Sequence, residues 1–258
     1  MVKTYTVEAI VLRRRPLGEA DRILTLLSRE RGKISAVAKG VRKTQSKFGA
    51  RLDFFNRAII TLHAGRSLDI VTGASSIGGA WERLVDPDAF AFASYVATAI
   101  DDLCEPGMPI PELFDVLCKT HDALSAGTSP GAIAAAVDLQ ILAALGLAPE
   151  LAACARCGDA LGRRPLVGGR ATLSPFAGGL ICRRCAQDPA LVEVSRRPGE
   201  QSLTISAQEL AALRALATAD LIDLAGHSAF ASLATVTHPF VRHHLGKRSR
   251  TLLAADRS

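Results

Sequence analysis

The chain has 258 residues, of which 48% are hydrophobic and 22% charged, and its formal net charge is +6. This composition is typical of a globular protein, and no run of about 20 apolar residues predicts a membrane span. Residues 1–15 carry charged side chains instead of the apolar stretch of a secretory signal. We therefore expect a cytoplasmic protein whose six cysteines are reduced or bound to metal.

The charge is distributed unevenly along the chain. Residues 1–80 contain 15 Lys and Arg against 6 Asp and Glu, a net charge of +9, whereas residues 81–150 contain 2 against 11, a net charge of −9. Residues 151–258 contain 14 against 8, a net charge of +6. A strongly basic first segment predicts a polyanionic partner.

Short β-strands are predicted throughout the first 79 residues. Apolar and polar residues alternate, or β-branched residues gather, over residues 5–13, 22–28, 33–39, 59–63 and 68–72. Turn signals lie between these segments, among them Pro16-Leu17-Gly18 and Arg31-Gly32. Five short strands in one small segment are typical of the five-stranded oligonucleotide/oligosaccharide-binding (OB) barrel. We predict this fold for residues 1–79.

The segment between the third and fourth predicted strands is basic and polar, so we expect a mobile loop. Its cations can follow a phosphate backbone and Phe48 can stack on one base, whereas Phe54 and Phe55 are interpreted as core. With two further cations from the predicted barrel, the DNA-binding candidates are Arg14, Lys33, Lys39, Arg42, Lys43, Lys47, Phe48 and Arg51. The alternatives are a merely solvated charged surface and an RNA ligand. Sparse aromatic residues predict binding that tolerates any base sequence.

Three helices are predicted within residues 80–150. Proline at a helix start marks each of them, at Asp86-Pro87, Pro111 and Ser129-Pro130. In the third helix apolar residues recur every four positions, and alanines occupy the other faces. This pattern predicts a helix that is buried nearly all round.

Further helices are predicted in residues 189–258. Ser206 and Glu209 have the spacing of a capping box. Pro239 is expected to break or kink the last helical segment. We predict that residues 80–150 and 189–258 form one helical domain.

Four cysteines have the spacing of a zinc site. They form two CxxC pairs: Cys154 with Cys157, and Cys182 with Cys185. Four thiolates around one ion leave no open position for water or substrate. We predict one structural Zn²⁺ in a module over residues 151–188, inserted into the helical domain, with disulfides and thioredoxin-like redox chemistry as alternatives. The remaining cysteines, Cys104 and Cys118, are expected in the core.

The sequence contains no motif typical of an enzyme. The six histidines form no HExxH, and no phosphate-binding GxxxxGK[ST] is present. Asp101 and Asp102 are adjacent, so on a helix they do not share a face. We expect no catalytic activity. The alternatives are a zinc-dependent nuclease or redox enzyme, or an RNA-binding OB and zinc module.

Several stretches resemble one known family. They are the segment from Glu8 to Ile23, Arg31 to Lys43, Glu112-Leu-Phe, Leu142 to Leu151 leading into Cys154, and His244-Leu-Gly-Lys. In this order, over nearly the whole chain, they resemble the bacterial recombination mediators of the RecO family.

The resemblance implies a fold and an activity. It implies an N-terminal OB fold, a helical domain and a zinc module, although family members without the cysteines exist. It also implies binding of single- and double-stranded DNA, annealing of complementary strands and, with RecR, loading of RecA onto strands covered by single-strand-binding protein (SSB). The family is expected to hold the acidic SSB tail against its helical domain. Residues 81–150 here offer only Arg83 and Lys119 as cations, so the basic C-terminal segment is expected to contribute. Such a protein would be associated with the nucleoid.

Overall fold

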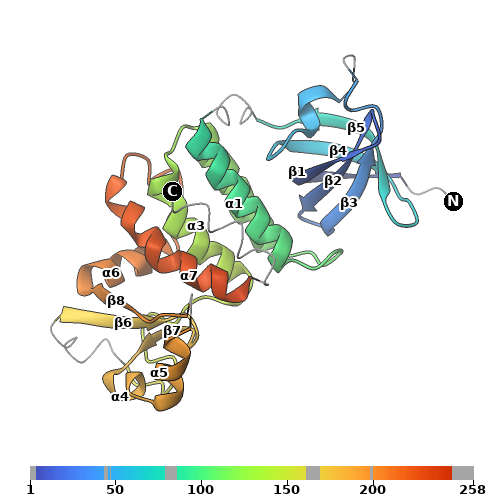
Figure 1. Ribbon diagram of the computed structural model, residues 1–258. Coiled ribbons are helices and arrows are strands. Elements are labelled where there is room, and N and C mark those ends of the chain that lie inside the picture. The colour runs from blue at the N-terminus through green and yellow to red at the C-terminus, as the bar shows by residue number, and fades with distance from the viewer. Residues whose placement is uncertain are drawn as a thin grey trace. The chain divides into compact units, whose positions relative to one another are not determined.

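The computed structural model describes residues 4–43, 46, 48–78, 86–160, 169–197 and 200–245. Described residues up to Pro130 belong to one compact unit, and those from Gly131 onwards belong to a second. The first unit contains a five-stranded barrel and two helices, and the second contains further helices and a three-stranded sheet (Figure 1). The domain limits given above remain predictions.

The barrel is formed by five strands in the order β1-β2-β3-β5-β4 (Figure 1). They are β1 (Thr4–Leu17), β2 (Asp21–Ser28), β3 (Gly32–Ala38), β4 (Arg57–His63) and β5 (Asp69–Ser76). Neighbouring strands are antiparallel except β3 and β5, which pair in parallel. The predicted OB-type barrel is confirmed. The turn predicted at Pro16 is wrong in one detail, because β1 continues through Leu17 and the turn begins at Gly18.

Alternating residues fill the barrel. In β3, Ile34, Ala36 and Ala38 are buried in its core while Ser35 is exposed, as the alternation predicts. The segment after β3 also contributes Val41 and Leu52 to this core, and a short 3₁₀-helix, η1 (Gly49–Leu52), lies within it. The segment is therefore partly anchored, rather than wholly a surface loop.

Helices α1 (Pro87–Leu103) and α2 (Pro111–Ser125) follow the barrel in the first unit. The Asp86 side chain accepts a hydrogen bond from the backbone N–H of Asp88 at the start of α1, and proline occupies the first turn of both helices. Both predicted helix starts are confirmed. Cys104 and Cys118 are buried, as expected, and burial raises the pKa of their thiols to about 11 and about 12.

Ion pairs join the basic barrel to these acidic helices. Asp101 of α1, 8% exposed, binds both Arg13 (2.5 Å) and Lys33 (3.1 Å). Three further pairs involve α2 or β1: Arg29 with Asp115, Arg57 with Asp122, and Arg57 with Glu8. The acidic block of the sequence thus neutralises part of the basic block within one unit.

His121 of α2 is buried against the barrel. It is 1% exposed, its ring lies 6.3 Å from that of Phe55, and its Nε2 has no hydrogen-bond partner. Its Nδ1 lies 2.9 Å from Oδ1 of Asp122, a carboxylate that favours the protonated ring. Burial outweighs this contact and lowers the pKa of His121 below its usual value.

Stability is expected to fall as the pH drops below about 6.5, the ordinary histidine pKa. The unfolded chain takes up a proton at His121 there, whereas the folded chain resists it, so protonation favours unfolding. One such group contributes at most about 1.4 kcal/mol per pH unit. Urea denaturation of the wild type and of His121→Gln at several pH values measures the effect, and His63→Gln serves as control. An equal stability difference between wild type and His121→Gln at pH 5.5 and pH 7.5 would contradict this assignment.

Helix α3 (Pro130–Ala144) is buried on every side. All residues from Ala132 to Leu142 are buried or nearly so, which confirms the prediction made from its composition. Asp138, fully buried, accepts hydrogen bonds from Thr237 Oγ1 (2.6 Å) and His238 Nδ1 (2.5 Å). These contacts fix α7 (Ala234–His244) against α3 within the second unit.

Of the two outcomes predicted for Pro239, a break in the last helical segment is not observed, and a kink stays a prediction. A 3₁₀-helix, η4 (Ser228–Leu233), leads directly into α7, and Pro239 lies inside α7 without ending it. Pro239 removes one backbone hydrogen bond. Burial of Val236, Phe240 and Val241 on either side of the proline offsets that loss.

A three-stranded sheet of order β7-β6-β8 lies in the second unit. Its strands are β6 (Arg170–Ser174), β7 (Gly179–Ile181) and β8 (Leu203–Ser206), and the accompanying helices are α4 (Arg183–Ala186), α5 (Pro189–Ser195) and α6 (Ala207–Leu216). The predicted capping box is confirmed at the start of α6. Strand β8 was not predicted, and it pairs with β6 although it lies beyond residue 188.

Within the described ranges, no helix has the length and apolar character needed to cross a membrane.

Candidate metal centre and nucleic-acid interface

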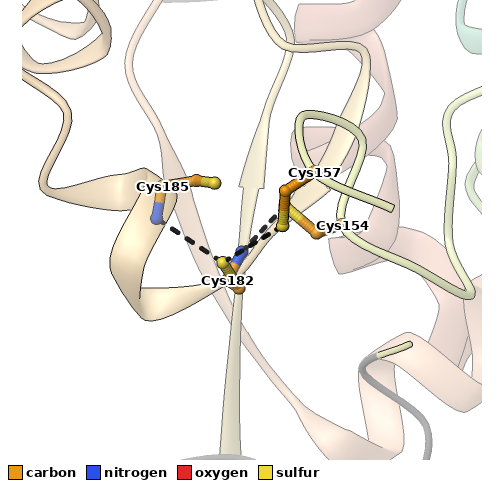
Figure 2. Close-up of side chains that lie close together, drawn as sticks. All are labelled: Cys154, Cys157, Cys182 and Cys185. Atoms are coloured by element: carbon orange, nitrogen blue, oxygen red, sulfur yellow. Dashed lines mark hydrogen bonds between the residues drawn. The ribbon is translucent and has the colours of Figure 1, made fainter. Parts of the chain in front are cut away.

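The four cysteines of the two CxxC pairs come together in the second unit (Figure 2). Cys154 and Cys157 lie in the segment that precedes β6, whereas Cys182 directly follows β7 and Cys185 lies in α4. Two short chain segments therefore supply two sulfur atoms each. In Figure 2 the four side chains face one another.

The spacing of the sulfur atoms suits one tetrahedral ion. All four Sγ atoms lie within 4.8 Å of one another, and Cys157 Sγ is 3.8 Å from Cys182 Sγ. Metal–sulfur bonds of about 2.3 Å place the corners of a tetrahedron about 3.8 Å apart. None of the four cysteines forms a disulfide. The arrangement therefore fits a metal site rather than the disulfide alternative.

Backbone geometry holds the two cysteine segments together. Leu180 of β7 donates its N–H to the Glu150 carbonyl and accepts one from Ala155, next to Cys154. Gly179 has a φ of +151°, and a Cβ on it would lie 2.3 Å from the Glu150 carbonyl oxygen. Only glycine allows this approach.

The protein stabilises the thiolate form of Cys154. Burial alone would raise the pKa of its thiol, but backbone N–H groups of Cys182, Cys157 and Arg156 point to the sulfur and lower the pKa to about 6. The Cys182 N–H lies 3.4 Å from this sulfur. A thiolate is the form that binds metal.

Arg184, between the cysteines of the second pair, compensates part of the negative charge of the cluster. Contact with Cys157 raises the pKa of the Arg184 guanidinium, and Arg156 forms an ion pair with Asp188 at 3.0 Å. Four thiolates with one divalent cation carry a net charge of −2, so the neighbouring Arg184 guanidinium stabilises the loaded site.

The DNA-binding candidates divide into two groups in the structure. Lys39, Arg42, Lys43 and Arg51 are exposed in the segment between β3 and β4. Arg42 donates through its side chain to the Gly18 carbonyl (3.1 Å) and through its backbone N–H to that of Ala20 (2.9 Å), so this segment lies beside the β1–β2 turn. Lys47 lies outside the described residues.

The other candidates have partners within the protein. Arg14 is half-buried and bound to Asp53, which also contacts Arg22 at 3.3 Å. The Lys33 side chain is only 13% exposed, and its ammonium group binds Asp101. Ion pairing therefore competes with any phosphate contact by these two residues.

Phe48 is also less available than predicted. It is partly buried and packs against the barrel core. The neighbouring Phe55 is fully buried, as expected for core, whereas Phe54 is half-buried and lies 5.4 Å from the ring of exposed Phe90. Base stacking on Phe48 remains a prediction.

Asp53 and Asp101 were missed as partners of the candidate cations. The only sequence signal for Asp101 was the acidic block at residues 81–150, which does not say which carboxylate meets which cation. Such pairings join residues far apart in the chain, and only the fold brings them together.

Two family models cover nearly the whole chain. The model described as "Recombination protein O N terminal" matches residues 1–80, and "Recombination protein O C terminal" matches residues 84–253. The chain belongs to the RecO family. RecO proteins act in DNA repair and recombination, and the structure adds the five-stranded barrel and the four-cysteine cluster.

Curated relatives support the RecO assignment. The chain is 34% identical to "DNA repair protein RecO" of Nocardioides sp. (strain ATCC BAA-499 / JS614), over 98% of this chain and 99% of that protein. It is 38% identical to the protein of the same name from Desulfitobacterium hafniense (strain DSM 10664 / DCB-2), over 80% and 73%. The corresponding identity for Anaeromyxobacter sp. (strain K) is 35%, over 93% and 91%.

Proposed function

We propose that this chain is a DNA-binding recombination mediator of recombinational repair. It binds single- and double-stranded DNA, anneals complementary strands and, with RecR, helps load RecA onto SSB-coated single-stranded DNA. The exposed basic segment between β3 and β4 is the observation that carries the proposal.

Charge pairing within the first unit supports the proposal that this segment is the interface. Arg13, Arg29, Lys33 and Arg57 contact carboxylates of α1 or α2, and Arg14 contacts Asp53. In the β3–β4 segment Lys39, Arg42, Lys43 and Arg51 are exposed to solvent. Single- and double-stranded DNA both present a phosphate backbone, so such a surface accepts either form.

The proposed cofactor is one structural Zn²⁺ held by Cys154, Cys157, Cys182 and Cys185. Closed tetrahedral sites of four thiolates are typical of zinc and leave no position for a reacting water. The ion would link the two cysteine segments and so stabilise the module.

The proposal includes the acidic tail of SSB as a partner. Lys119 is the exposed cation of α2, whereas Arg83 and the basic residues after Leu245 lie outside the described residues. We assign most of the positive charge for this contact to the basic C-terminal segment.

We also propose that the protein acts at the nucleoid, in the cytoplasm.

Strand annealing on SSB-coated complementary oligonucleotides tests the proposed function. The purified protein is expected to accelerate duplex formation, followed by fluorescence energy transfer between labelled strands, without cleaving either strand in the presence of divalent metal. Matched RNA strands form a parallel arm. Failure to bind single-stranded DNA at low salt would overturn the proposal, cleavage would favour a nuclease, and a marked preference for RNA would favour the RNA-binding alternative.

A further inference from the structure

Three side chains from different strands and turns form one cluster on the barrel. Arg31, in the β2–β3 turn, lies over the ring of Tyr5 with Cζ 3.9 Å from the ring centroid. The Tyr5 hydroxyl donates a hydrogen bond to Oδ2 of Asp69, at the start of β5. Oδ1 of Asp69 accepts the backbone N–H of Gly65 at 2.9 Å. Asp69 therefore links Tyr5 to the β4–β5 loop, with one carboxylate oxygen bonded to each.

The Tyr5 ring has a further contact that fixes it. It packs against the hydrophobic core of the barrel. Burial, together with the bond to Asp69, raises the pKa of Tyr5, so its hydroxyl stays protonated and remains a donor. The guanidinium of Arg31 therefore rests on a rigid aromatic support.

Arg31 is exposed, so the side of its guanidinium turned away from Tyr5 is accessible. The residues of the two turns that meet at this cluster carry both signs: Glu30 and Asp69 are acidic, Arg66 is an exposed cation of the β4–β5 loop, and Arg29 is paired with Asp115. Mixed signs give less attraction for phosphate than the basic β3–β4 segment does. A flat, cationic surface is instead suited to a π-system, and nucleobases stack on arginine planes.

The position of the cluster points to the same ligand. In five-stranded barrels of this kind, the face of the second and third strands and the loop between the fourth and fifth strands contact oligonucleotides. Arg31 connects β2 to β3, and Asp69 ends the β4–β5 loop. Phe48 of the β3–β4 segment is partly buried against the core, so less of its ring is available for stacking.

We propose that Arg31, held flat on Tyr5, is a stacking platform for one unpaired base of single-stranded DNA. The proposal rests on the DNA binding proposed above and adds a base contact to its phosphate contacts. Because every base has a flat π-face, the contact is tolerant of sequence.

Arg31→Lys tests the platform because it keeps the positive charge and removes the planar guanidinium. Affinities are measured for a single-stranded oligonucleotide and for an abasic strand of equal length. The variant is expected to bind the normal strand about 5-fold or more weakly and the abasic strand as the wild type does. The salt dependence of binding should not change, because no charge is lost.

Arg66→Lys is the matched control, since it makes the same exchange in the nearby β4–β5 loop, where no ring contact is found among the described residues. It should leave both affinities unchanged. A fluorescent base analogue in the strand gives a second signal, because stacking quenches it and Arg31→Lys should reduce the quenching.

The outcomes separate the two proposals. If the wild type binds neither strand, the proposed function fails. If it binds both but Arg31→Lys binds the normal strand as tightly as the wild type, or loses affinity equally for both strands, the stacking platform is overturned while DNA binding stands.

Discussion

Cys182→Ser is expected to reduce bound zinc from one equivalent per chain to nearly none and to unfold the cysteine module. Cys182 has two tasks: its sulfur is one of four metal ligands, and it accepts the backbone N–H of Cys185 at the start of α4 (3.5 Å). Structural zinc binding contributes about 10–16 kcal/mol in isolated zinc-finger peptides, so loss of one ligand removes a large part of the local stability. Elemental analysis measures the metal, and hydrogen exchange over β6 and β7 measures the local fold.

Cys104→Ala is the control for this variant, because Cys104 is buried in the first unit and lies outside the cluster. It should retain a full equivalent of zinc. Reducing agent alone should leave the module folded, which a disulfide would not allow. Wild-type protein with far less than one equivalent of metal, and with unoxidised cysteines, would disprove the metal site, and iron in place of zinc would correct the proposed cofactor.

The double variant Arg42→Gln/Lys43→Gln is expected to lose about 10- to 30-fold in affinity for single-stranded DNA near 0.1 M salt. Each phosphate contact contributes about 0.7 to the slope of log affinity against log salt, so the slope should become shallower by about 1.4. The loss should be similar for all base sequences, because phosphates are alike. Fluorescence anisotropy titrations at a series of salt concentrations measure both quantities.

Arg196→Gln/Arg197→Gln removes the same charge from two exposed arginines of the second unit and is the matched control. Its affinity and salt slope should stay close to those of the wild type. An unchanged affinity and slope for the Arg42/Lys43 variant would move the DNA interface away from the β3–β4 segment. The exposed arginines beside the cysteine cluster would then be the next to test.

Local sequence patterns predicted the parts of the fold that depend on local physics. Alternation identified the barrel strands, prolines and the Asp86 side chain marked the helix starts, and the CxxC spacing identified the four clustered sulfurs. These signals are strong because each of them depends on residues that are close together in the sequence. The buried environment of α3 followed from its alanines in the same way.

Features that depend on distant residues could not be predicted. The alternation of β3 places Lys33 on the face away from the core, as expected for a DNA-binding cation. Its ammonium group nevertheless binds Asp101, which lies 68 positions away in the sequence. Strand β8 has only four residues and ends at Ser206, which opens the capping box, so the sequence was interpreted only from Ser206 onwards, as the start of a helix. Pro239 stays inside α7 because the packing around it outweighs its local preference.

The pairing of β8 with β6 has a consequence for truncated forms of this protein. The strand lies 18 residues or more beyond the last cysteine, yet it completes the sheet on which the metal-binding segments rest. Deletion of residues 151–188 would remove β6, the partner of β8. The unpaired backbone of β8 next to α6 would then favour aggregation. A metal-free variant is therefore better made by replacing each of the four cysteines with a small apolar residue. Deleting the whole segment that carries them would also remove the partner strand of β8.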